Sequence, residues 1–315
     1  GNSELSVQLA DRAAKLPPLP LLDGTDNMSP RSREQSRKTH RQIAGSLSGR
    51  GLFEWAEREY RLVIQSAPMN DPTAMGCRIE MLEMLGDLER HADAIAIIQP
   101  LLDRISRDDE TRGRFMQFAN YAEDQLRGLY LFHRAETEIA ADKLEKARAS
   151  LTNGFRLFPE NIDILIRMYR VDGDEKWKTI VDAKLRTLIA GYEAQLNLQP
   201  GAAAILGSSQ RRLLAANCNQ YAWLVSNTRG DFRRALEAGK LAVKLDPGYA
   251  NLDTLARCYY ALGRYDEALA TQRQAIELEP HSPPLQRQLK LIETAREQTK
   301  SESAKPEPAK PERSK

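Results

Sequence analysis

A recurring helical hairpin is the feature that most constrains what this chain can fold into. Its clearest copy, LDTLARCYYALGRYDEALATQRQAIELEP, runs from Leu252 to Pro280. Aliphatic and aromatic residues recur there at helical spacing on both sides of Gly263, and alanines such as Ala256 and Ala268 stand where the two helices would touch. Because one hairpin cannot bury both of its faces alone, copies of it must stack on one another.

Other segments repeat the same order of small, aromatic and proline positions. The copies at 218–247 and 40–68 keep it through both helices, whereas the copy near 144–159 keeps it only in its second helix. This order resembles the tetratricopeptide repeat pattern, W-x-x-L-G-x-x-Y…A-x-x-x-F…P. In the clearest copy the matching residues are Leu252, Leu255, Ala256, Tyr259, Ala268 and Pro280, while Gln272 replaces the second aromatic residue. The resemblance is to members of the bacterial type and covers the windows 37–70, 128–161 and 216–281, with diverged central repeats between them.

The whole chain is expected to be α-helical. No segment alternates polar and apolar residues as a strand does, and apolar residues keep a helical period over 112–140 and 175–196. The fold class that the resemblance implies is all-α, a tetratricopeptide-like α-solenoid whose antiparallel hairpins form a right-handed superhelix. We expect an extended segment at 1–28, a first hairpin at 29–70, diverged hairpins with long helices at 71–199, two well-matched repeats at 208–281, a capping helix at 282–298 and a disordered tail at 299–315.

Composition fits such a chain and excludes several classes of protein. With 41% hydrophobic and 29% charged residues, the 315 residues can bury a core and keep a solvated exterior. The net charge of +2 is too small to indicate a nucleic-acid partner, and no run approaches the roughly 20 apolar residues of a membrane-spanning helix. Cys77, Cys218 and Cys258 are expected to be buried free thiols, which favours the cytoplasm. The chain begins at Gly1 rather than at a methionine, so the periplasm stays open as an alternative if an upstream signal has been removed.

No arrangement of residues indicates catalysis. Neither of the common nucleotide motifs, G-x-G-x-x-G and the Walker loop, is present, and the four histidines have no partner at a metal-ligand spacing. The acidic pairs at 108–109 and 172–175 are expected to begin helices, where carboxylates favour the positive end of the helix dipole. We therefore expect no enzyme, no catalytic residues, no metal and no cofactor in this chain.

An interaction scaffold is the function class that remains, and the resemblance implies where it would bind. In the family's geometry, the first helices of the repeats line a concave groove that holds a peptide or helix of a protein partner. The positions facing that groove in the two best repeats are Asn219, Gln220, Trp223, Ser226, Asn227, Asp253, Thr254, Arg257 and Tyr260. They combine aromatic anchors, amides and one arginine suited to a carboxylate. For Trp223, exposure in the groove and packing between helices stay equally open.

A second candidate surface is the basic stretch RSREQSRKTHR at 31–41. Arg37, Lys38 and Arg41 could contact an acidic peptide or a phosphate, and the alternative is a solvated helix face. A second function is also open, in which the chain is an accessory module of a larger enzyme or envelope complex whose active domain lies upstream. The residues that some family members use to grip the tails of chaperones are not matched, so that partner is not implied.

Overall fold

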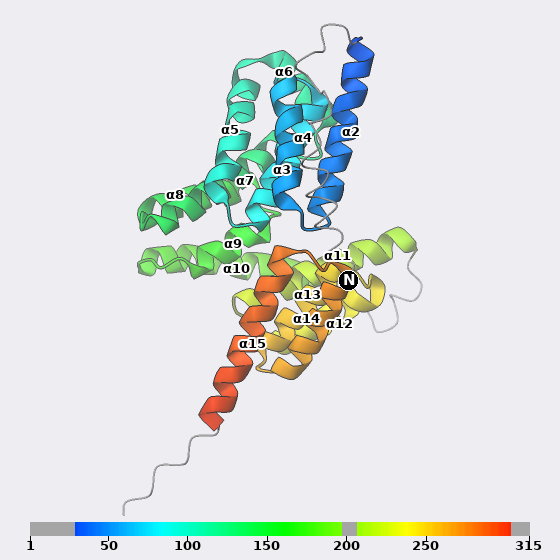
Figure 1. Cartoon of the computed structure of the whole chain (residues 1–315). Coiled ribbons are helices and arrows are strands. Elements are labelled where there is room, and N and C mark those ends of the chain that lie inside the picture. Colours follow the sequence, from blue (N-terminus) through cyan, green and yellow to red (C-terminus); the bar gives the residue numbers. More distant parts are fainter. Residues whose placement is uncertain (1–28, 197–206, 304–315) are drawn as a thin grey trace, which may run out of the picture. The chain divides into compact units, whose positions relative to one another are not determined.

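The described part of the chain, residues 29–196 and 207–303 of the computed structural model, consists of fourteen α-helices (Figure 1). They are α2 (Pro30–Ser48), α3 (Phe53–Ser66), α4 (Pro72–Asp87), α5 (His91–Arg107), α6 (Asp109–Phe118), α7 (Glu123–Ala140), α8 (Leu144–Leu157), α9 (Ile162–Arg170), α10 (Glu175–Leu196), α11 (Ser208–Asn227), α12 (Phe232–Leu245), α13 (Tyr249–Ala261), α14 (Tyr265–Leu278) and α15 (Pro283–Ser303). No strand occurs in these residues, so the predicted all-α fold is confirmed there. The segment at 1–28 and most of the tail at 299–315 lie outside the described residues.

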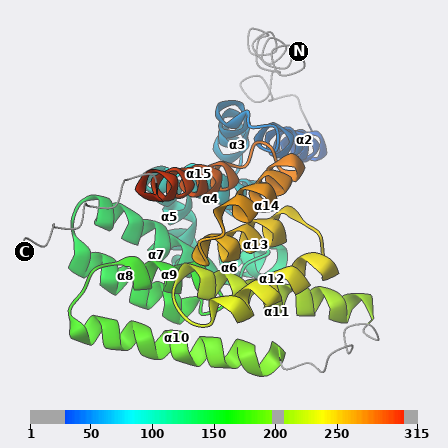
Figure 2. The same cartoon turned by 90° about the horizontal axis from the view of Figure 1, so that it is seen from below.

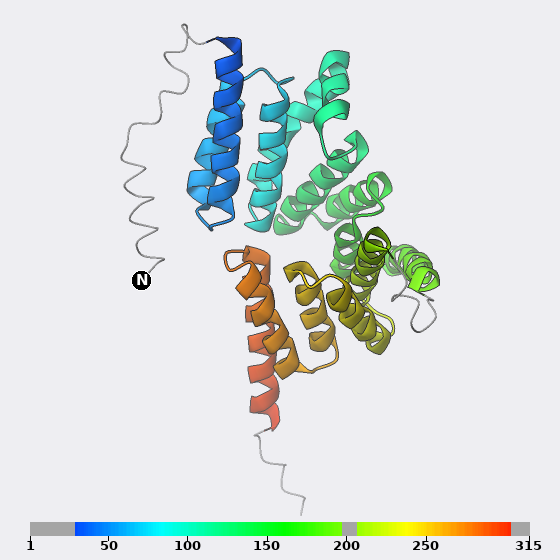
Figure 3. The same cartoon turned by 90° about the vertical axis from the view of Figure 1, so that its right-hand side faces the viewer.

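Two compact units make up the chain, Gly1–Leu126 and Arg127–Lys315, and the boundary between them falls within α7. In the first unit α2 pairs with α3 and α4 with α5, while α4 contacts both α2 and α6 (Figure 3). In the second unit α11 pairs with α12 and α13 with α14, and α11 contacts both α9 and α13. α15 packs on α14 and α13 (Figure 2). Each unit therefore has a layer of alternate helices, the first-helix layer, in which successive hairpins meet.

Local sequence signals explain where helices begin and end. α2 starts with Pro30 after Ser29, whose hydroxyl oxygen accepts a backbone N–H of the first turn. At the turn of the clearest hairpin, Gly263 has a φ of 71°, and the N–H of Arg264 bonds to the carbonyl of Tyr259. Glycine adopts this left-handed conformation without the steric penalty of a Cβ, so α13 can stop and α14 can begin within a short turn.

Small residues allow the two helices of a hairpin to approach closely. Ala256 on α13 and Ala268 on α14 are fully buried in one cluster with Ile292 of α15, as the sequence predicted for the two alanines. The corresponding alanines of the other clear copies are also fully buried: Ala44 and Ala56, and Ala222 and Ala235. A larger side chain at such a position would cost about 1–3 kcal/mol by overpacking, which explains why alanine recurs there.

Some helix ends differ from the sequence expectation. The apolar period over 112–140 is interrupted, because α6 ends at Phe118 and the backbone of Ala119 is extended. The hydrophobic pattern does not predict this break, because alanine is compatible with both a helical and an extended backbone. α15 continues to Ser303, past the boundary expected at 298. α10, in contrast, spans Glu175–Leu196 as the periodicity predicted.

Other local predictions are confirmed. Asp109 is the first residue of α6, and the carboxylate of Asp174 accepts the backbone N–H of Trp177 at 2.8 Å as α10 begins. All three cysteines are buried free thiols. Burial raises the pKa of Cys77 to about 12 and that of Cys218 to about 11, so both stay protonated at neutral pH.

Candidate functional site

The predicted groove residues lie on α11 and α13, which are neighbours in the first-helix layer of the second unit. α9 borders α11. Three polar side chains of α9 bond to residues of α7 or α11: Asp163, Arg167 and Arg170. Side-chain contacts between hairpins thus connect α9 and α11. We call the surface formed by these three α9 residues and the predicted groove residues the inner face.

Trp223 is both packed and partly exposed. Its ring packs against a core cluster centred on α8, α9 and α10, and it remains half-buried. The indole Nε1–H donates a hydrogen bond to Oδ1 of Asp163 at 2.7 Å. Desolvation raises the pKa of the Asp163 carboxyl, although this hydrogen bond and the charge of Arg170 oppose the shift. Trp223 therefore links α11 to α9 while part of the indole stays accessible.

Other predicted residues of α11 and α13 are occupied by contacts within the protein. Asn227 is buried, its Oδ1 accepts a hydrogen bond from Arg170, and its Nδ2 donates to the backbone carbonyl of Trp223 at 3.0 Å. The hydroxyl of the buried Ser226 donates to the same carbonyl at 3.3 Å. Thr254 is 3% exposed. These side chains set the spacing of the helices and offer little surface to a ligand.

Asp253 bonds to the last two helices. Its Oδ1 accepts hydrogen bonds from Nε2 of Gln272 on α14 at 2.7 Å and from Nε2 of Gln288 on α15 at 2.9 Å. The fully buried Gln272 amide also donates to the carbonyl of Leu285 at 3.0 Å. Desolvation raises the pKa of Asp253 to about 6, and the hydrogen bond from Gln272 partly offsets that rise. The Asp253–Gln272–Gln288 network thus joins α13, α14 and α15.

Arg257 is the predicted groove residue whose guanidinium has hydrogen-bond donors without an acceptor. Its guanidinium lies 4.6 Å from the ring centroid of Tyr260, but within the described residues it makes no hydrogen bond or ion pair, and its Nε is buried without an acceptor. Desolvation and the nearby charge of Arg170 lower the pKa of Arg257. Oδ1 of Asn219 is likewise buried without a donor in the described part of the chain, while Gln220 is half-buried.

The contribution of α9 was missed by sequence reasoning. Its three polar residues fall at 163, 167 and 170, a spacing that places them on one side of a helix. This stripe of polar residues could have indicated the contribution of α9. However, the repeat period is diverged over 71–199, so the sequence does not show which helix there is the first helix of a repeat. Arg167 makes a two-point contact with Glu136 of α7, at 2.6 and 2.8 Å.

Every member of the basic patch on α2 has a carboxylate partner. The pairs are Arg37 with Asp71 at 2.9 Å, Lys38 with Glu34 at 2.6 Å and Arg41 with Glu80 at 2.9 Å. Arg37 and Asp71 are also nearly buried. Carboxylates of the same unit therefore compensate most of the positive charge that the sequence shows at 31–41.

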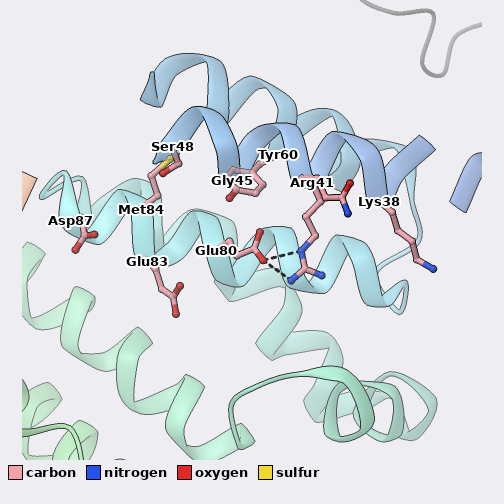
Figure 4. A pocket seen from close by; sticks show the side chains of 10 residues that line it. Lys38, Arg41, Gly45, Ser48, Tyr60, Glu80, Glu83, Met84 and Asp87 are labelled. Atoms are coloured by element: carbon pink, nitrogen blue, oxygen red, sulfur yellow. Dashed lines mark hydrogen bonds and ion pairs between the residues drawn. The ribbon is translucent and has the colours of Figure 1, made fainter. Parts of the chain in front are cut away.

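A pocket lies in the first unit between α2 and α4 (Figure 4). It has a volume of about 720 Å³ and is lined by Lys38, Arg41, Gln42, Gly45, Ser48, Tyr60, Glu80, Glu83, Met84 and Asp87. The Arg41–Glu80 pair spans it, from α2 to α4. Lys38 and Arg41 of the basic patch thus line the α2 side of this pocket, and three acidic residues line its α4 side.

Neither a metal site nor a membrane-spanning helix occurs in the part of the chain that the structure describes. No group of three or more His, Cys, Asp or Glu side chains among residues 29–196 and 207–303 is placed to hold a metal ion. His40 pairs instead with the carboxylate of Glu59. Within the same ranges, every helix is too short or too polar to cross a bilayer.

Comparison with known proteins points to the same repeat. The tetratricopeptide repeat family model matches residues 228–291, whereas no curated protein sequence matches the chain. Among solved structures, the thermophilic TPR protein TTC0263 of Thermus thermophilus is 16% identical with a TM-score of 0.36, over 82% of this chain and 99% of that one. MamA protein is 15% identical with a TM-score of 0.28, over 78% and 92%, and yeast Tom70 is 17% identical with a TM-score of 0.32, over 85% and 56%. The residues that the family model matches form antiparallel helices with fully buried alanines at their contacts, as the resemblance to the tetratricopeptide repeat predicted.

Proposed function

We propose that this chain is a non-enzymatic scaffold that binds a peptide or helix of a partner protein on the inner face of its second unit. The observation that carries the proposal is the guanidinium of Arg257. It is the one predicted groove side chain with a full charge and no hydrogen-bond or ion-pair partner among the described residues. A ligand carboxylate would supply that partner, because the planar guanidinium matches a carboxylate with two parallel hydrogen bonds.

The energetics of the inner face support this assignment. A buried polar atom without a partner costs about 1–3 kcal/mol, and the neighbouring charged groups avoid that cost. Arg167 bonds to Glu136, Asp163 accepts from Trp223, and Asp253 accepts from two glutamines. Arg257 departs from this pattern, and the aromatic ring of Tyr260 beside it adds aromatic surface for a partner.

The alternative, an accessory module of a larger enzyme or envelope complex with an upstream active domain, would use the same inner face. Catalysis by the described residues has no support, because the histidines are scattered along the sequence and the acidic pairs lie where helices begin. The three buried free thiols support the cytoplasm as the compartment, since oxidising compartments favour disulfides.

An affinity experiment with matched variants tests the proposal. The full chain, its Arg257→Gln variant and its Arg233→Gln variant are immobilised and exposed to lysate of the native host, and retained proteins are quantified by mass spectrometry. Arg233 is an exposed arginine on α12, so its variant controls for the lost charge. A partner should be retained by the wild type and by Arg233→Gln and reduced at least about tenfold by Arg257→Gln. If no retained protein separates the two variants, the inner face is not the binding surface.

A further inference from the structure

Two arginines of the second unit approach each other near the end of α11. Arg170 of α9 donates a hydrogen bond to Oδ1 of Asn227, in the last turn of α11. The thiol of Cys258 on α13 donates to the carbonyl of Ala222, which is also on α11, at 3.8 Å. Arg257 precedes Cys258 and lies near enough to Arg170 for the charge of Arg170 to lower its pKa. Guanidinium groups from two hairpins therefore lie close together on the inner face.

Neither guanidinium makes an ion pair with a carboxylate in the described part of the chain. Arg170 is exposed and bonds to a neutral amide, while Nε of Arg257 is buried without an acceptor. Asp163 and Asp253 lie nearby and raise the pKa of Arg170 and Arg257 respectively. Their carboxylates, however, accept hydrogen bonds from the indole of Trp223 and from two glutamine amides. The two acids reduce the positive potential but leave both guanidiniums without an anionic acceptor in contact.

Two neighbouring side chains complete the surroundings of this arginine pair. Arg167 precedes Arg170 on α9, but it is neutralised by its two-point contact with Glu136. Tyr260 lies beside both members of the pair: its ring centroid is 4.6 Å from the guanidinium of Arg257, and it also raises the pKa of Arg170. Its phenolic hydroxyl adds a hydrogen-bond donor beside the two arginines.

The arginine pair favours an anion with more charge than one carboxylate. A carboxylate bound to Arg257 fills the two parallel hydrogen bonds of one guanidinium and leaves Arg170 without an anionic partner. A phosphate monoester carries a charge of about −1.5 to −2 at neutral pH and has three strong acceptor oxygens. It can therefore accept from both guanidiniums and offset their mutual repulsion, and clusters of arginines are a common means of recognising phosphorylated segments.

We infer that the inner face recognises a partner segment with a phosphorylated side chain, whose phosphate binds between Arg170 and Arg257 beside Tyr260. This inference rests on the proposed function, because it uses the same face and specifies the chemistry of the residue that binds there. Binding is then regulated by the partner: the unmodified segment lacks the anion that the arginine pair needs, and phosphorylation supplies it.

The test uses the full chain and three mixtures of fluorescein-labelled, acetylated and amidated nonapeptides. The central residue is phosphoserine, glutamate or serine, and the other positions are random among uncharged residues. Retention of each mixture is measured on immobilised wild type, Arg170→Gln, Arg257→Gln and Arg233→Gln. Arg233 is an exposed arginine on α12, so its variant matches the charge change. Circular dichroism and melting confirm that each variant is folded.

Wild type should retain the phosphoserine mixture best, the glutamate mixture less and the serine mixture least. Arg170→Gln and Arg257→Gln should each reduce retention of the phosphoserine mixture about tenfold, whereas Arg233→Gln should leave it unchanged. Equal retention of the phosphoserine and glutamate mixtures, or the same loss from Arg233→Gln, would overturn the inference. Displacement of the phosphoserine mixture by an equal concentration of inorganic phosphate would also overturn it, because the site would then take the free ion.

Native partners separate this inference from the proposed function. Lysate of the native host is treated with active or heat-inactivated phosphatase and passed over the same four proteins. A protein that is lost after active phosphatase, and also from both Arg170→Gln and Arg257→Gln, agrees with the peptide result and supports the inference. A protein retained through Arg257 regardless of phosphatase rejects phosphate recognition but keeps the scaffold function. If no retained protein depends on Arg257, the proposed function itself is rejected.

Discussion

The indole N–H of Trp223 on α11 donates a hydrogen bond to the carboxylate of Asp163 on α9, 2.7 Å away. The bond connects two hairpins through residues that are 60 positions apart in the sequence. It also fixes the orientation of the one tryptophan on the inner face. The exposure of Trp223 is therefore set by its neighbour on α9 as well as by its own helix.

Removing the acceptor should loosen Trp223. In a background with Trp55→Phe and Trp177→Phe, which leaves Trp223 as the single tryptophan, Asp163→Ala should increase quenching of its fluorescence by acrylamide. It should also lower stability by about 1 kcal/mol, the net value of one hydrogen bond. Asp163→Asn keeps an acceptor oxygen and should restore the wild-type quenching. Identical quenching in the Ala and Asn variants would show that the hydrogen bond does not orient the indole.

The raised pKa of Asp253 predicts a pH dependence of stability. Its folded pKa is about 6, above the ordinary value of 3.8, so the folded protein binds this proton more tightly than the unfolded chain. The raised pKa of Asp253 stabilises the folded protein below about pH 4, and this stabilisation is lost as the pH rises through about 6. The loss in the free energy of unfolding is at most about 3 kcal/mol, and solvent screening makes it smaller.

Comparison of variants isolates that contribution. Asp253→Asn cannot titrate but keeps an oxygen for the two glutamine amides, so its melting temperature should change less between pH 4 and pH 6.5 than that of the parent. Glu277→Gln, at an exposed position of α14, should retain the parent's profile. Parallel profiles for Asp253→Asn and the parent would mean that the carboxyl titrates near its ordinary pKa.

Ala268→Arg should be severely destabilising. Ala268 is fully buried in a cluster with Ala256 and Ile292, so an arginine would overpack the contact and bury an unpaired charge. The expected cost is about 3–5 kcal/mol, measured by thermal melting. Ala270→Arg places the same side chain at an exposed position of the same helix and should melt with the parent. Melting of Ala268→Arg within a degree or two of the parent would contradict the tight contact.

Two truncations should differ in effect. Deletion of 300–315 removes only the exposed end of α15 and the tail, and melting should stay unchanged. Deletion of 282–315 removes the buried Leu285 and Ile292 and exposes the Asp253–Gln272 pair, so melting should fall. Scanning calorimetry of both chains measures this difference, and equal melting would show that α15 does not cap the array.

The sequence alone predicted the hairpins in the segments where the repeat period is strict. It did not predict the side-chain partners that lie on other repeats. The alanines at 256 and 268 are constrained by local geometry, so their burial was predictable. Asp253 was assigned to the groove by register alone, yet it bonds to Gln288, whose orientation depends on how α15 packs. The pairing of Arg37 with Asp71 was not recognised either. Those two residues lie 34 positions apart, about one repeat, so comparison of neighbouring repeats could have found the pair.

The replacement of an aromatic residue by Gln272 has a consequence for how this repeat array can grow. Arrays of this kind lengthen when a hairpin is duplicated and inserted between its neighbours. The Gln272 amide bonds to Asp253 and to the backbone of α15, so a copy placed one repeat earlier would lose its partner on α15. The amide would keep its bond to the duplicated Asp253, but the N–H that now bonds to α15 would be buried without an acceptor, which costs about 1–3 kcal/mol. Duplication of the last hairpin is therefore penalised, and insertions upstream of α13 should be tolerated better.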